Sequence, residues 1–303
     1  MTAAYEQTVV LGTGSLALNC ALSLKKAGME CRLFDMNEKL SKSLRRQAHY
    51  YEVDYFFGKP RRAAEEILAI PGRVLLISAI NSWILPGSLL NREGLKAINC
   101  HQALLPKHPG RNAEMWAVYE GDRQTGITWH EMSEQVDAGK ILIQKSFPLT
   151  GEDTAWSVFR RQMVAAYEGF QEILEPLLEG KAVGIPQNSR ERGRLRYSWE
   201  IPENGILDPG WNGKQISAFL RAVDYAGLSV LTRRPAVHFE GENWFWKKYR
   251  ISGGGLAKER IRMEKSTLVI EKDGYFITLY DCVKEDEENG TADEIIERIT
   301  AGG

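Results

Sequence analysis

The chain has 303 residues, enough for two domains, and its content of 43% hydrophobic and 26% charged residues is typical of a globular protein. Its formal net charge of −1 predicts no general electrostatic attraction to nucleic acid or to a membrane surface. The four cysteines form no C-x-x-C pair and no zinc-type cluster, so we expect reduced thiols and no metal.

The amino-terminal residues predict the compartment. Residues 1–7 lack the basic and then apolar pattern of a signal peptide. No apolar run approaches the roughly 18 residues that a membrane helix needs. We therefore expect a cytoplasmic protein without a membrane-spanning segment.

The first third of the chain alternates short apolar runs with stretches of helical periodicity. Apolar runs predict strands, and recurrence on one helical face predicts helices. The strands are expected at 8–11, 31–35, 73–79 and 97–100, and the helices at 15–27, 37–47 and 60–70. This alternation predicts an α/β fold with a parallel sheet that is covered on both faces.

Helices and strands continue up to residue 178, and the pattern changes after residue 180. A helix at 112–119, strands at 125–131 and 140–147 and a long helix at 153–178 come first. A polar stretch at 180–196, with five basic residues, then resembles a linker. Short strand-like runs follow at 236–239, 244–251, 260–263, 268–270 and 275–281, as in a small β-barrel or sandwich. We place a first domain at 1–190, a linker at 191–205 and a small β-rich domain at 206–303.

A glycine-rich turn follows the first predicted strand. Gly12 and Gly14 precede a predicted helix, and Asp35 ends the next strand, which resembles a dinucleotide-binding fingerprint. Any strand-to-helix turn in a doubly wound sheet also favours glycine. Both interpretations stand at this point, and the first would make the chain a dinucleotide-binding regulatory protein.

Three polar side chains point to chemistry. Asn99 and His101 are two residues apart at the end of a strand, so they face the same side, whereas Cys100 faces the core. Asp137 lies in a loop that enters the strand at 140–147. An amide donor, an imidazole and a carboxylate are the groups that acyl-type transfer requires.

The sequence around these residues resembles a known family. Asn99-x-His101, Leu-Leu-Pro at 104–106, Gly110, Trp116-Ala117, Thr-Gly-Ile-Thr at 125–128 and Val136-Asp137-x-Gly139 are similar to the folate-dependent formyltransferases. That family includes methionyl-tRNA formyltransferases, sugar N-formyltransferases and peptide-synthetase formylation domains. The resemblance, dense over 75–150, implies a Rossmann-like sheet in the first domain and an OB-like, β-barrel-like second domain.

The resemblance also implies a mechanism and its residues. The co-substrate would be 10-formyltetrahydrofolate, with Asn99 and His101 holding a tetrahedral oxyanion and Asp137 orienting His101 and helping to remove the amine proton. The implied folate-binding residues are Trp83, Ile84, Leu85, Leu104, Leu105, Pro106 and Val136. The candidate acceptor-binding residues are His108, Arg111, Asn112 and His130.

Several alternatives concern the acceptor. A primary amine on a small molecule, such as an amino sugar nucleotide or amino acid, and an amine linked to a carrier protein both fit. The near-zero net charge weighs against tRNA. A hydrolase that releases formate from the same folate would use identical residues, and a homo-oligomer is compatible with the sequence.

Overall fold

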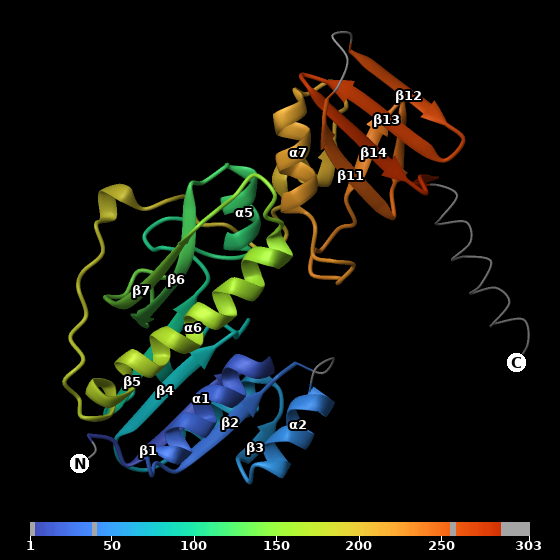
Figure 1. The fold of residues 1–303 in the computed structure, drawn as a ribbon. Coiled ribbons are helices and arrows are strands. Elements are labelled where there is room, and N and C mark those ends of the chain that lie inside the picture. The colour runs from blue at the N-terminus through green and yellow to red at the C-terminus, as the bar shows by residue number, and fades with distance from the viewer. Residues whose placement is uncertain (1–3, 38–40, 255–258, 286–303) are drawn as a thin grey trace, which may run out of the picture. The chain divides into compact units, whose positions relative to one another are not determined.

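The computed structural model describes residues 4–37, 41–254 and 259–285 (Figure 1). The chain divides into two compact units. Unit 1 contains residues 1–113, 124–149 and 158–196, and unit 2 contains residues 114–123, 150–157 and 197–303.

Unit 1 is built on a seven-stranded sheet in the order β3-β2-β1-β4-β5-β6-β7. The strands are β1 (Gln7–Gly12), β2 (Cys31–Asp35), β3 (Asp54–Phe57), β4 (Val74–Ala79), β5 (Leu95–His101), β6 (Gln124–Glu131) and β7 (Ile141–Pro148). Neighbouring strands from β3 to β5 pair in parallel, whereas β5–β6 and β6–β7 pair antiparallel. The prediction of a mostly parallel sheet is therefore confirmed.

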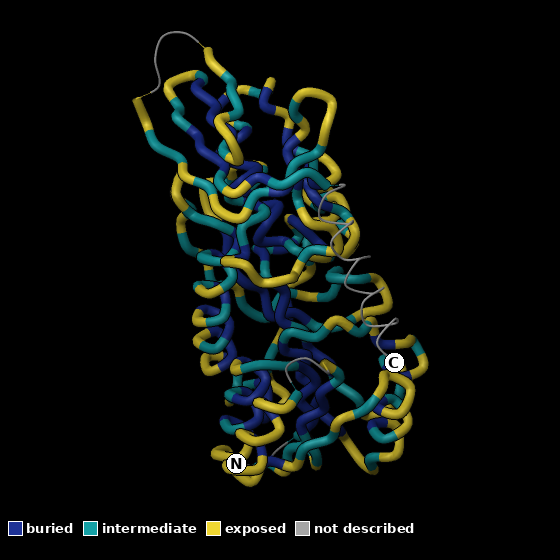
Figure 2. Tube along the Cα trace, turned by 90° about the vertical axis from the view of Figure 1, so that its right-hand side faces the viewer, coloured by how far each residue is buried: buried dark blue, intermediate teal, exposed yellow. Residues whose placement is uncertain are grey.

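Apolar side chains fill both faces of this sheet. Along β1, Val10 joins one buried cluster, while Val9 and Leu11 join another on the opposite face. The first six α-helices of the described chain are α1 (Gly14–Lys26), α2 (Ser41–Tyr50), α3 (Pro60–Leu68), α4 (Gly87–Leu90), α5 (Ala113–Tyr119) and α6 (Ala155–Leu178). Helices α1, α2 and α6 cover the Val10 face, and α3 and α4 cover the other. Strand β4 is consequently buried along its whole length, and Figure 2 shows the buried stretches of the chain enclosed by exposed ones.

The glycine-rich turn has a packing role. A Cβ atom on Gly12 would lie 1.7 Å from the carbonyl oxygen of Ala79 on β4, so close strand packing alone demands glycine there. Asp35 is fully buried, and its carboxylate accepts hydrogen bonds from the Tyr55 hydroxyl and the Asn37 N–H, each at 2.9 Å. These contacts favour the structural interpretation of the turn over dinucleotide binding.

Unit 2 contains two four-stranded sheets, most of α5 and the helix α7 (Gly213–Ala222). One sheet has the order β15-β10-β9-β8, from β15 (Val283–Lys284), β10 (Glu242–Phe245), β9 (Ala236–Phe239) and β8 (Ile206–Leu207). The other has the order β11-β14-β13-β12, from β11 (Lys248–Gly253), β14 (Tyr275–Tyr280), β13 (Thr267–Lys272) and β12 (Arg260–Glu264). Both sheets and α7 share one apolar cluster, which confirms a β-rich carboxyl-terminal unit.

Two elements have other bounds than the sequence predicts. The apolar run at 244–251 predicts one strand, but it divides between β10 and β11, which belong to different sheets. The helix expected at 37–47 begins at Ser41 in the described part, because residues 38–40 lie outside it. Among the described residues, no helix is both long and apolar enough to span a membrane.

Candidate active site

The site is built at the carboxyl end of β5, where the sheet changes from parallel to antiparallel pairing. Strand β6 pairs Asn99 with His130 and His101 with Thr128. These four side chains share one face, while Cys100 and its partner Trp129 enter the core on the other face. Cys100 is only 4% exposed, as expected for a core residue rather than a nucleophile.

Asp137 lies in the turn between β6 and β7 and reaches this face. Its Oδ2 is 3.4 Å from Nδ1 of His101, and its Oδ1 is 3.5 Å from Nε2 of His130. The Gly110 N–H donates to the same carboxylate at 2.8 Å, and Asn99 Nδ2 lies 3.2 Å from His130 Nε2. The structure therefore brings together Asn99, His101 and Asp137 and adds His130 to them.

Backbone carbonyls fix the tautomers of the two imidazoles. Nε2 of His101 lies 2.8 Å from the carbonyl oxygen of His108, and Nδ1 of His130 lies 2.8 Å from that of Glu131. Because a carbonyl oxygen only accepts, each of these nitrogens carries a proton. The remaining nitrogen of each ring faces Asp137, so a proton gained by either ring is held against the carboxylate.

Burial and neighbouring charges shift the pKa values of Asp137 and His101 in opposite directions. Burial tends to raise the pKa of Asp137, but the two imidazoles and the Gly110 N–H outweigh it and hold this pKa well below the usual range. Burial lowers the pKa of His101, and the Asp137 carboxylate opposes that change. At neutral pH, Asp137 is thus ionised, and His101 is neutral and able to accept a proton.

The loop after His101 is held by two polar side chains. The buried Thr128 hydroxyl donates to the Ala103 carbonyl at 2.6 Å and accepts from the Leu105 N–H at 3.0 Å. Gln144 donates both to that hydroxyl and to the Leu105 carbonyl. Sequence reasoning assigned no role to Thr128 or Gln144, although the register of β5 and β6 places Thr128 opposite His101.

Replacing Thr128 by valine keeps the shape and removes the hydroxyl. We expect the free energy of unfolding to fall by about 1–3 kcal/mol, since the buried Leu105 N–H loses its partner. Urea unfolding followed by tryptophan fluorescence measures the change. Thr128→Ser is the control, because serine retains the hydroxyl; equal stability of the valine variant and the wild type would contradict this role.

The predicted folate-binding residues differ in exposure. Leu85 and Leu105 are buried, Trp83 packs against the apolar cluster that contains Leu85, and Ile84 is 72% exposed. Leu104, Pro106 and Val136 are half-buried, and all three lie in the loops that carry the site. The pocket that these residues form remains a prediction.

The predicted acceptor residues also fall into two groups. His130 contacts Asp137. His108 is buried, and its carbonyl oxygen accepts a hydrogen bond from the His101 ring. Arg111 is exposed, and Asn112 occupies a left-handed conformation at φ +53°. Only His108 and His130 therefore touch the catalytic candidates.

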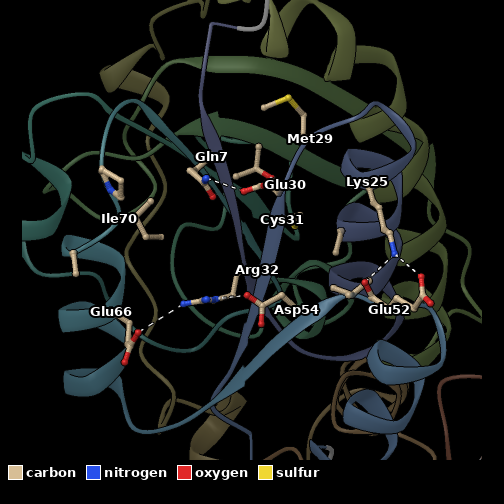
Figure 3. A pocket seen from close by; sticks show the side chains of 15 residues that line it. Gln7, Lys25, Met29, Glu30, Cys31, Arg32, Glu52, Asp54, Glu66 and Ile70 are labelled. Atoms are coloured by element: carbon tan, nitrogen blue, oxygen red, sulfur yellow. Dashed lines mark hydrogen bonds and ion pairs between the residues drawn. The ribbon is translucent and has the colours of Figure 1, made fainter.

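A separate cavity lies at the opposite, amino-terminal ends of the parallel strands. It has a volume of about 680 Å³ and is lined by the amino-terminal ends of β1, β2 and β3 (Figure 3). Most of its charged residues form ion pairs: Arg32 with Asp54 at 2.5 Å and with Glu66 at 3.7 Å, and Lys25 with Glu52 at 3.6 Å. The remaining one, Glu30, accepts a hydrogen bond from the Gln7 amide at 2.9 Å. No candidate catalytic residue lines this cavity.

Comparison with known proteins identifies the region that carries the site. Residues 64–174 match the model of the formyl transferase family, and this range contains Asn99, His101, His130 and Asp137. Over these residues the chain is similar to the formyl transferase family. The family match thus covers the strands and loops that assemble the site.

Two curated formyltransferases are similar to part of the chain. The chain is 32% identical to a GDP-perosamine N-formyltransferase of Brucella melitensis over 149 residues, which are 49% of this chain and 56% of that protein. It is 35% identical to a methionyl-tRNA formyltransferase of Enterococcus faecalis over 140 residues, 44% of this chain and 45% of that one. The chain therefore spans about half the length of the curated relatives that it matches.

The likeness of folds extends further along the chain. An N-formyltransferase from Helicobacter canadensis, solved in complex with folinic acid and dTDP-3-aminofucose, aligns with a TM-score of 0.72 at 16% identity. The alignment covers 90% of this chain and 98% of that chain. At this identity the comparison establishes a shared fold.

Proposed function

We propose that this protein transfers a formyl group from 10-formyltetrahydrofolate to a primary amine. The observation that carries the proposal is the position of Asp137 between His101 and His130, beside Asn99, within the family-matched region. This arrangement combines an amide donor with a buried cluster that can accept a proton. Folate-derived ligands in related structures, such as folinic acid in the Helicobacter canadensis protein, support the choice of donor.

The residues divide the chemistry between them. The amine attacks the formyl carbon, and the carbonyl oxygen becomes an oxyanion. The Asn99 amide stabilises it by a hydrogen bond, and His101 stabilises it through its positive charge once it has taken up a proton. The proton lost by the amine passes to the cluster of Asp137 and the two imidazoles. The bond from carbon to N10 of the folate then breaks, and N10 takes up a proton.

We further propose a small-molecule acceptor, with an amino sugar nucleotide as the first candidate. GDP-perosamine and dTDP-3-aminofucose appear in the names of similar proteins, which supports this class. Free and carrier-linked amino acids are the alternatives. Methionyl-tRNA is disfavoured because the net charge of −1 provides little attraction to a long polyanion.

The test is formyl transfer from 10-formyltetrahydrofolate to a panel of amines. The panel contains amino sugar nucleotides, amino acids, an aminoacyl carrier protein and methionyl-tRNA. Amine-dependent release of tetrahydrofolate, with the formyl group on an amino sugar, is the expected result. Formate release without amine would identify a hydrolase, and transfer only to tRNA would overturn the acceptor class.

The dinucleotide hypothesis has its own test. Gly12 is required by close packing against Ala79, and the Asp35 carboxylate is bound by the Tyr55 hydroxyl. We therefore expect NAD to leave the melting temperature unchanged, whereas a folate should raise it. A rise with NAD and none with folate would reverse the proposal.

A further inference from the structure

Residues 185–196, here called the strap, lie across both loops of the site. The strap belongs to unit 1, although its polar sequence resembles a linker. At its start, Ile185 and Ile141 exchange two backbone hydrogen bonds of 2.8 Å. Further along, the Gly193 N–H donates to the Pro106 carbonyl at 3.0 Å. The strap therefore touches the loop after His101 as well as the strand that follows Asp137.

Two side chains of the strap hold the backbone around Asp137. Arg192 donates through Nη1 to the Asp137 carbonyl at 3.1 Å and through Nη2 to the Val136 carbonyl at 2.6 Å. Gln187 donates to the Asp137 carbonyl at 2.9 Å and to the Gly139 carbonyl at 2.8 Å. Four hydrogen bonds thus converge on three carbonyls of one short turn.

A third contact leads from the strap to the carboxylate itself. The Arg196 N–H donates to the Pro109 carbonyl at 3.0 Å, and the Arg196 carbonyl accepts from the Arg111 N–H at 2.9 Å. Gly110 lies between Pro109 and Arg111, and its N–H donates a hydrogen bond to the Asp137 carboxylate. A Cβ atom added at Gly110 would lie 2.1 Å from the Arg196 carbonyl oxygen, so the close approach of the strap requires glycine there. The same segment therefore supports both the backbone and the carboxylate of Asp137.

This support matters because the backbone of Asp137 is not in a favoured conformation. Its φ of +50° lies in the left-handed region, which side-chain-bearing residues adopt at a cost and retain only when their surroundings impose it. The guanidinium fork of Arg192 is suited to hold two adjacent carbonyls at once, and its charge strengthens both bonds. Lysine offers no such planar fork.

We propose that Arg192 is a positioning residue which, with Gln187, holds Asp137 between His101 and His130. Its catalytic consequence rests on the proposed function, whereas its effect on His101 does not. Without Arg192, the turn relaxes and the carboxylate moves away from the imidazole. His101 then loses the negative charge that favours its protonated form.

The test compares Arg192→Ala with Arg190→Ala, an exposed arginine two residues away. NMR titration of the histidine rings, of which the chain has five, measures the pKa of His101 directly. We expect Arg192→Ala to lower that pKa and Arg190→Ala to leave it unchanged. An unchanged His101 titration in a folded Arg192→Ala protein would overturn the proposal.

Steady-state kinetics provide the second readout. We expect kcat to fall about 10- to 100-fold in Arg192→Ala, with KM for the folate little changed, because a displaced catalytic group slows chemistry rather than binding. Arg192→Lys is expected to restore only part of kcat, and Arg190→Ala to match the wild type. Wild-type kcat in Arg192→Ala would contradict the positioning role.

A further variant covers the case in which Arg192→Ala does not fold. Gln187→Ala removes two of the four bonds and is expected to shift the His101 pKa in the same direction by a smaller amount; no shift there would then decide against the strap's role. If the wild type shows no formyl transfer, the proposed function fails, but the NMR comparison still tests the strap.

Discussion

Replacing His101 by alanine is expected to lower kcat for formyl transfer by at least about 1000-fold, the largest effect that we predict. The substitution removes a proton acceptor and, with it, the positive charge that would stabilise the oxyanion. It also leaves the buried Asp137 carboxylate with one imidazole instead of two. Single-turnover measurement of tetrahydrofolate release isolates the chemical step from product release.

His49→Ala is the matched control for this variant, since His49 is exposed on α2. It should retain wild-type kcat. A His101→Ala enzyme with more than about a tenth of the wild-type rate would remove His101 from the mechanism. His130, which also faces Asp137, would then be the next residue to test.

Asp137→Asn is expected to lower kcat by about 100- to 10,000-fold and to move the acid limb of the pH profile to lower pH. The direction follows from charge. The carboxylate raises the pKa of His101 against the effect of burial, so an uncharged amide lets that pKa fall further. The dependence of kcat/KM on pH, in buffers of constant ionic strength, measures the shift.

The same substitution is expected to change how stability depends on pH. The pKa of Asp137 is lowered in the folded state, so its contribution is present above the ordinary value of about 4 and is lost as pH falls toward the folded value. Urea unfolding at several acidic pH values should show a shallower loss of stability in Asp137→Asn than in the wild type. An unchanged acid limb together with an unchanged stability profile would show that Asp137 does not interact with His101.

The sheet of unit 1 and the catalytic candidates were accessible from sequence for a common reason. Strand alternation is local, so continuous apolar runs predict buried strands, and Asn99 and His101 must share a face. The resemblance around Val136-Asp137 supplied the partner that alternation alone does not reveal. The structure places these side chains within 3.5 Å of one another or of His130.

The contribution of the strap was not predictable in the same way. Gln187 and Arg192 act on backbone carbonyls some 50 residues earlier in the chain, and such bonds impose no periodicity on the sequence. A polar stretch rich in arginine is therefore read as a linker. The prediction of one strand at 244–251 is wrong for a related reason. The chain passes from one sheet to the other within this run, and that change leaves the hydrophobic pattern intact.

The environment of the four cysteines determines how this protein tolerates oxidants and electrophiles. All four are free thiols, and burial raises the pKa of each, that of Cys31 to about 12. Thiolates, the reactive species, are therefore scarce at physiological pH. Cys100 separates Asn99 from His101 in the chain, but its sulfur is buried and a thiol-directed reagent would not reach it. A covalent inhibitor aimed at this site would therefore need to react with an imidazole or a carboxylate.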